Sequence, residues 1–353
     1  MKRRILNIIV VGIALLALIT SCAHRELRDP QNTHYVRIYL DEQIKNVTCG
    51  FYNESLERPE YERPTVLRAI LANQQTGEVV SERILRNSGE DAKGHYIDGH
   101  IAAKEGVYNF MVYELGSSIT LLRDEDNYYG MEAYTNPVND YLLQYIPATR
   151  NEVDNKNIVN APEHLFHCAC QEIKISNSTE TDTIKNVNGD YFTARSIAKS
   201  YYIQVNVKGF EYITSAASLL NGVAGSVFMS APNELNAEDS VHLFFGMNYT
   251  GKRAAKSGES TVATLYATFN TFGKIPDIPS IYALNFEFMK RDGTSQVVKI
   301  DITDLFETPM VKENQWIILD HMIEITPPEG ENQGGGMRPG VDEWKDIESE
   351  IIM

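Results

Sequence analysis

The chain has 353 residues, of which 43% are hydrophobic and 23% are charged, and its formal net charge is −16 at pH 7. This mixture can bury a core and the length leaves room for two domains, so a disordered chain is not expected. An acidic surface repels phosphate groups, which argues against nucleic-acid partners and against attachment to a membrane by charge alone.

The first residues have the pattern of an export signal. Lys2, Arg3 and Arg4 precede an apolar run from Ile5 to Ile19, and the stretch Leu18–Cys22 (LITSC) follows. Signal peptides combine a basic start, a short apolar run and small residues at the cleavage point. The run of about 15 residues is shorter than the roughly 20 that span a bilayer. The pattern resembles a bacterial lipoprotein signal, so we expect residues 1–21 to be removed and Cys22 to be acylated.

Residues 22–34, which begin with the acylated cysteine and are mostly polar, are predicted to form a tether. From Tyr35 onward apolar and polar residues alternate, as in Val36, Ile38 and Leu40 or in Tyr108, Phe110 and Val112. Alternation of this kind is typical of half-buried strands in antiparallel sheets. We therefore expect residues 35–170 to form a first β-sandwich.

The same alternation continues through the second half of the chain. It is seen in Ile203, Val205 and Val207, and Asp292-Gly293 has the composition of a hairpin turn between two further strands. Helical periodicity is scarce, and the one short helix we predict spans Thr214–Asn221. Residues 171–328 are expected to form a second sandwich, which places the chain in the all-β class as two tandem domains.

Cysteine and histidine residues offer a weak case for a metal site. Cys49, Cys168 and Cys170 remain once Cys22 is acylated, and the sequence leaves open whether Cys49 pairs with either of the others. His164, His167, Cys168 and Cys170 (HLFHCAC) carry zinc-type ligands, but on a strand His167 points away from the two thiols. We interpret this cluster as structural and expect no metal or other cofactor.

Other motifs for chemistry are absent from the sequence or incomplete. The acidic stretch Asp124–Gly130 (DEDNYYG) has tyrosines where a calcium loop needs Asp or Asn and then Gly, so we expect a solvated turn. The Gly-x-Ser-x-Gly motif of serine hydrolases, the zinc-protease helix and a phosphate-binding loop do not occur. We expect no enzymatic activity, although glycoside hydrolysis requires only two facing carboxylates and stays open.

Several tyrosines crowd one region of the sequence, namely Tyr128, Tyr129, Tyr134, Tyr141 and Tyr145. Exposed aromatic side chains are used by sugar-binding and protein-binding faces, whereas buried ones cover the edge of a core. The region therefore supports an alternative function, a surface lipoprotein that binds glycans.

The C-terminus carries a separate apolar segment. Pro327-Pro328 and a Gly-rich linker lead into Val341–Met353 (VDEWKDIESEIIM), so we treat residues 329–353 as linker and terminal segment. Its apolar residues are Val341, Trp344, Ile347, Ile351 and Ile352, and their spacing fits either a helix or a strand. The segment either packs on its own chain or adds a strand to a partner by β-augmentation.

The order of several motifs resembles the anchor and minor subunits of fimbrillin-like, Bacteroidota-type (type V) pili. These motifs are the lipidated Cys22, Pro162–Phe166, Lys208–Ile213 followed by Ala216-Ala217, Gly222–Ser230, and Val341–Trp344. The resemblance implies two transthyretin-like Greek-key sandwiches, an outer-membrane lipid anchor and other pilus subunits as partners.

In that family subunits join by donor-strand exchange, which implies that Val341–Met353 enters a neighbouring subunit. Stalk subunits of the family lose an N-terminal strand by cleavage after a basic residue, and Arg28 and Arg37 are available here. An anchor that stays bound to its lipid is expected to avoid this cut. One departure is that Ala23–Arg28 lacks the acidic run often found in surface-exposed lipoproteins of these bacteria.

Overall fold

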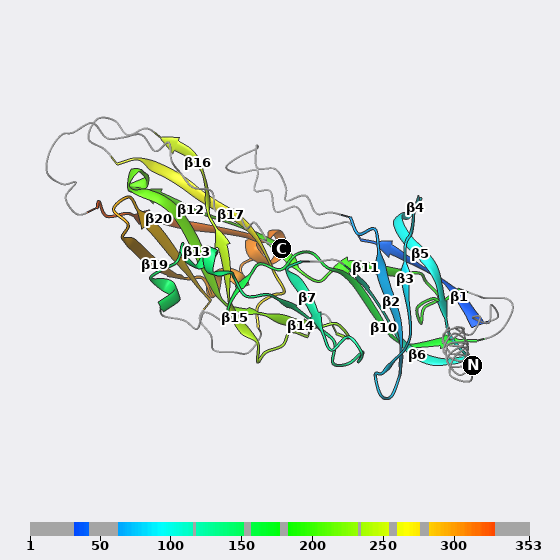
Figure 1. Cartoon of the computed structure of the whole chain (residues 1–353). Coiled ribbons are helices and arrows are strands. Elements are labelled where there is room, and N and C mark those ends of the chain that lie inside the picture. The colour runs from blue at the N-terminus through cyan, green and yellow to red at the C-terminus, as the bar shows by residue number, and fades with distance from the viewer. Residues whose placement is uncertain are drawn as a thin grey trace, which may run out of the picture.

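The computed structural model describes residues 32–41, 63–115, 118–151, 157–176, 183–231, 234–253, 260–275 and 282–328. These residues form several sheets and only short helices. Strands β1 to β6, β10 and β11 gather at one end of an elongated molecule, β12, β13, β15 to β17, β19 and β20 lie at the other, and β7 and β14 lie between them (Figure 1). No helix in the described ranges is long and apolar enough to cross a membrane.

Eight strands of the first part are hydrogen-bonded in the order β3-β2-β6-β10-β11-β1-β5-β4. Their bounds are β1 (Thr33–Leu40), β2 (Leu67–Asn73), β3 (Val79–Leu85), β4 (Asn87–Asp91), β5 (Gly94–Ala102), β6 (Gly106–Glu114), β10 (Phe166–Ile175) and β11 (Phe192–Ser196). The expected boundary between residues 170 and 171 falls inside β10, which pairs with β6 and β11.

This series of strands folds over on itself and encloses the first core. It turns at β11, where Phe192–Ala194 pair with β1 while Arg195 and Ser196 pair with β10. The two sides approach again at β3 and β5, where the Ser81 hydroxyl donates a hydrogen bond to the Ala102 carbonyl at 2.6 Å. The enclosed core takes apolar residues from β1, β2, β3, β5, β6, β10 and β11.

A small sheet covers the outer face of β2 and β6. It consists of β7 (Thr120–Arg123), β8 (Glu132–Thr135) and β14 (Ser226–Phe228) in the order β14-β8-β7. Met111 and Tyr113 of β6 pack there against Ala133 and Val227. Because β14 follows directly on β13 of the second half, this core joins the two parts of the chain.

The second half places two sheets face to face around the largest core. Their orders are β16-β17-β12-β20 and β19-β18-β13-β15-β9. The bounds are β9 (Ile158–Asn160), β12 (Lys199–Lys208), β13 (Ile213–Ala224), β15 (Ser240–Gly246), β16 (Asn248–Arg253), β17 (Val262–Thr271), β18 (Ala283–Lys290), β19 (Ser295–Asp301) and β20 (Trp316–Glu324). The short helices are α2 (Asp140–Leu143), α3 (Pro309–Asn314), η2 (Thr149–Asn151), η4 (Phe210–Tyr212) and η5 (Asp304–Glu307).

The strands expected from alternation are confirmed. Ile203, Val205 and Val207 of β12 all point into the second core. The Asp292-Gly293 turn joins β18 to β19, with Gly293 at a φ of 81° and the Lys290 amide donating to the Thr294 carbonyl at 2.8 Å.

The helix predicted at Thr214–Asn221 is wrong, because these residues lie in the 12-residue strand β13. The strand pairs with β15 on one side and β18 on the other. Ala216 and Leu220 point into the main core, whereas Ala217 and Leu219 are buried beneath the α2 segment. Because both faces are covered, the strand shows no apolar–polar alternation, and its Ala and Leu content imitates a helix.

Candidate sites for assembly

The residues predicted to contact the membrane and a partner lie outside the described residues. These are Cys22 for lipidation and Val341, Trp344, Ile347, Ile351 and Ile352 for partner binding. Cys49 also lies outside them. The described chain begins at Asn32, next to β1, and ends at Pro328, shortly after β20. The two elements nearest to the predicted sites are therefore β1 and β20.

Strand β1 is built into the first core by its apolar face. Val36 and Ile38 are fully buried and Leu40 is 7% exposed. The strand pairs with β5 in antiparallel register along Thr33–Tyr39 and with β11 in parallel register along Ile38–Leu40. Removing β1 would therefore strip apolar side chains from the core and leave strand edges unpaired on both sides.

The opposite face of β1 is held by a polar and aromatic ladder centred on Arg37. Its guanidinium carbon lies 3.8 Å from the ring centroid of Tyr96, and its nitrogens lie 3.1 Å from Asp91 and 3.4 Å from Asp98. Such stacking combined with ion pairing holds an arginine on a sheet surface. Arg37 therefore lies within a strand that is bonded on both edges, which protects the peptide bond after it from a protease.

Tyrosines on either side of Arg37 extend this ladder. Tyr35 donates its hydroxyl hydrogen bond to Asp98, and Tyr39 donates to Asp91 at 2.8 Å. Burial, followed by the hydrogen bond to the Asp98 carboxylate, raises the pKa of Tyr35 to about 12, so the phenol stays a donor at neutral pH. The sequence shows the alternation of Tyr35, Arg37 and Tyr39, but it could not identify Asp91 and Asp98 as their partners.

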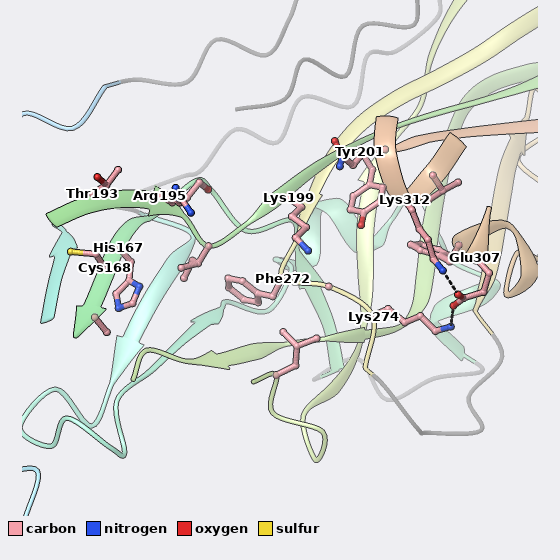
Figure 2. Close-up of a pocket in the computed structure, with 18 residues that line it drawn as sticks. His167, Cys168, Thr193, Arg195, Lys199, Tyr201, Phe272, Lys274, Glu307 and Lys312 are labelled. Carbon is pink, nitrogen blue, oxygen red and sulfur yellow. Dashed lines mark hydrogen bonds and ion pairs between the residues drawn. The ribbon is translucent and has the colours of Figure 1, made fainter. Parts of the chain in front are cut away.

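A pocket of about 680 Å³ opens between β10 and β11 on one side and the η5–α3 segment on the other (Figure 2). Its apolar lining includes Ile197, Tyr201, Leu235 and Phe272. Four basic side chains also line it, namely Arg195, Lys199, Lys274 and Lys312. We call it the junction pocket.

One carboxylate, Glu307, lines the junction pocket among the described residues. It forms ion pairs with Lys312 at 2.7 Å and with Lys274 at 3.0 Å. These two ammonium groups lower the pKa of Glu307 to about 2. The pocket lining is therefore cationic, in contrast to the acidic chain as a whole, and it lacks the pair of facing carboxylates that glycoside hydrolysis requires.

The histidine and cysteine cluster has the orientation expected of a strand. Cys168 and Cys170 pack against the first core, whereas His167 is buried on the other face of β10. Burial lowers the pKa of His167 to about 3 and raises that of Cys168 to about 12, and both thiols are free. The described part of the chain contains no group of three or more His, Cys, Asp or Glu side chains that could hold a metal ion.

The acidic stretch Asp124–Gly130 forms a turn organised by Asn127. The Asn127 side-chain carbonyl accepts hydrogen bonds from the amides of Tyr129 at 2.9 Å and Gly130 at 3.1 Å. Glu125 forms an ion pair with Arg68 of β2. Both side chains therefore make contacts within the protein.

The five tyrosines of the same region do not form one exposed face. Tyr128 is fully buried in the core beneath the small sheet, and Tyr145 is 9% exposed beside the α2 segment. Tyr129 packs edge-on against Tyr128, whereas Tyr141 packs edge-on against Tyr145. Because two of them fill separate cores, they do not supply the platform that glycan binding would use.

Comparison with known proteins tests the resemblance to fimbrial subunits independently of the structure. A family model described as a domain of unknown function, DUF5119, matches residues 87–246. A Bacteroides ovatus protein described as the fimbrium-anchoring subunit Fim4B is 21% identical over 274 residues, which cover 70% of this chain and 74% of that protein. The chain is therefore similar to a fimbrium-anchoring subunit of Bacteroides over most of its length. The resemblance drawn from the sequence is thereby confirmed.

The fold of this chain is also found among solved structures. A Bacteroides ovatus protein described as an adhesin has a crystal structure that aligns with a TM-score of 0.56 at 19% identity. The alignment covers 88% of this chain and 98% of the other. The two proteins therefore share their overall fold.

Proposed function

We propose that this protein anchors a fimbrium to the outer membrane as a non-enzymatic lipoprotein. Acyl chains on Cys22 would hold it in the membrane, residues 22–34 would form the tether, and Val341–Met353 would join a neighbouring subunit. The observation that carries the proposal is the match to Fim4B, which extends over 70% of the chain. Each half of the chain would correspond to a transthyretin-like Greek-key sandwich domain.

The construction of β1 supports an anchoring role. The proposed tether enters the folded body directly at β1, so any pull between fibre and membrane acts on this strand. Both faces of β1 are held, one by the first core and the other by the Arg37 ladder. A subunit that keeps this strand stays connected to its lipid, whereas cleavage after Arg37 would separate the body from Cys22.

The terminal segment supplies the proposed link to the next subunit. A strand placed in the groove of a partner satisfies its backbone hydrogen bonds along its length and buries alternate side chains. Val341, Trp344, Ile347, Ile351 and Ile352 would be the side chains that the partner buries. This mechanism also accounts for an apolar segment that follows a Gly-rich linker.

The lipid anchor can be tested in a Bacteroidales host that expresses the chain with its fimbrial subunits. We expect Cys22→Ser to abolish labelling by a palmitate analogue and to release fibres into the medium. Cys49→Ser is the matched control and should retain both label and attachment. Retained label and cell-bound fibres in Cys22→Ser would contradict the proposed anchor.

The terminal segment can be tested in the same host. Ile347→Asp combined with Ile351→Asp places charges on side chains that a partner would bury, so we expect fibres to lose their attachment to this subunit. Glu348→Ala lies in the same segment and should leave assembly unchanged. If the double variant assembles as well as the parent chain, donor-strand exchange through this segment is refuted.

A further inference from the structure

We infer that the junction pocket is the docking site of the chain's own C-terminal segment, Val341–Met353. The inference rests on the proposed function, because the same segment is proposed to be donated to a neighbour. Docking would cover its apolar side chains while no neighbour is bound. The strand donor would thus be stored on its own subunit.

The first support is complementary chemistry. The pocket combines apolar side chains such as Ile197 and Phe272 with the cations Arg195, Lys199, Lys274 and Lys312. Glu307, which is shared by Lys274 and Lys312, and Asp41, which pairs with Arg195 at 2.9 Å, neutralise only part of this charge, because the four cations are paired with two carboxylates. The segment VDEWKDIESEIIM has the opposite composition, with acidic residues among the apolar ones and Lys345 as its single basic residue. Opposite charges around an apolar contact favour binding of the acidic terminal segment to the cationic junction pocket.

The second support is reach. Gln315, which precedes β20, lines the pocket, and β20 then leads away from it to Glu324. At about 3.3 Å per residue, the 13 residues from Trp316 to Pro328 cover at most about 43 Å. The linker of residues 329–340 can extend to about 43 Å at most. Its reach therefore matches the distance back to the pocket.

The third support is tethering. A Gly-rich linker of this length is expected to hold the segment at an effective concentration in the millimolar range. Even a weak contact with the pocket is then populated within one molecule. A neighbouring subunit that offers a complete groove would compete for the segment by forming a full set of backbone hydrogen bonds.

Tryptophan fluorescence of the full chain tests this docking. The sequence has two tryptophans, Trp316 and Trp344. In a Trp316→Phe background, Trp344 reports on the segment alone. We expect blue-shifted emission and protection from acrylamide compared with a free peptide of residues 341–353, and both should be independent of protein concentration.

Charge variants identify the pocket as the binding site. Lys199→Glu combined with Lys312→Gln removes positive charge from the lining while Lys274 keeps its ion pair with Glu307. We expect a several-fold increase in acrylamide quenching of Trp344. Lys104→Glu combined with Lys299→Gln makes the same change of charge on exposed positions away from the pocket and should leave quenching unchanged. Circular dichroism of each variant checks that the fold is retained.

Three results would overturn the inference. One is quenching of Trp344 in the parent chain equal to that of the free peptide. Another is protection that survives the loss of Lys199 and Lys312 charge. The third is protection that appears only as protein concentration rises, which would place the segment on a second copy. Because these measurements use the isolated chain, their outcome is separate from that of the fibre-assembly experiments.

Discussion

Strand β1 provides the sharpest quantitative prediction, through the substitution Ile38→Ala. Ile38 is fully buried in the first core and pairs with Phe192 and Ile97 on either side. The change deletes every side-chain carbon beyond Cβ and leaves a cavity, which should cost about 3 kcal/mol of unfolding free energy. Urea unfolding followed by circular dichroism measures this loss.

The same substitution should make β1 easier to release. If opening is fast compared with cleavage, a loss of about 3 kcal/mol increases the open population about 100-fold. Trypsin cleavage after Arg37, followed by mass spectrometry, reports that population. Val80→Ala on β3 is the control, because Val80 is 53% exposed and its truncation should change neither quantity.

The reasoning would be refuted if Ile38→Ala lowered the unfolding free energy by less than about 1 kcal/mol. It would also be refuted if Arg37 were cleaved in the folded parent chain as readily as in the variant. Either result would mean that β1 is not held in the sheet as the register and burial indicate. The proposed path from lipid to folded body would then lose its structural basis.

Three further predictions concern groups buried in the two halves of the chain. Burial gives His167 a pKa of about 3 in the folded chain, against roughly 6.5 when unfolded, so its contribution to stability is complete above pH 6.5 and is lost as the pH falls toward 3. At pH 5 the loss of unfolding free energy is about 2 kcal/mol, and His167→Gln should make the unfolding free energy depend less on pH than in the parent chain. The fully buried carboxylate of Glu287 accepts hydrogen bonds at 2.8 Å from two backbone amides at the start of η2, so Glu287→Ala should cost about 3 kcal/mol in urea unfolding, whereas Glu324→Ala at an exposed ion pair should cost less than about 1 kcal/mol. Gly209 has a φ of +86° and a Cβ there would lie 2.7 Å from a backbone oxygen, so Gly209→Ala should lower the melting temperature clearly more than Gly189→Ala, where φ is +82° and the space is open.

Much of the strand content could be predicted from the sequence. Alternation of apolar and polar residues predicts strands such as β1 and β12, which have one more deeply buried face, because the side-chain direction changes at every residue. The Asp292-Gly293 turn was predictable because few residues other than glycine adopt its positive φ. The family resemblance was also readable, since it depends on the order of motifs along the chain.

The fold decided what depends on residues far apart in the sequence. The composition of strand β13 imitates a helix because its Ala and Leu residues face two different cores, and only the packing of the α2 segment on one face and of the second sheet on the other shows this. The partners of Arg37 lie in β4 and β5, more than 50 residues along the chain. The junction pocket likewise combines β10, β11 and α3. Local periodicity records whether a residue is buried, whereas only the tertiary structure determines which residue it meets, because distant segments come together by folding.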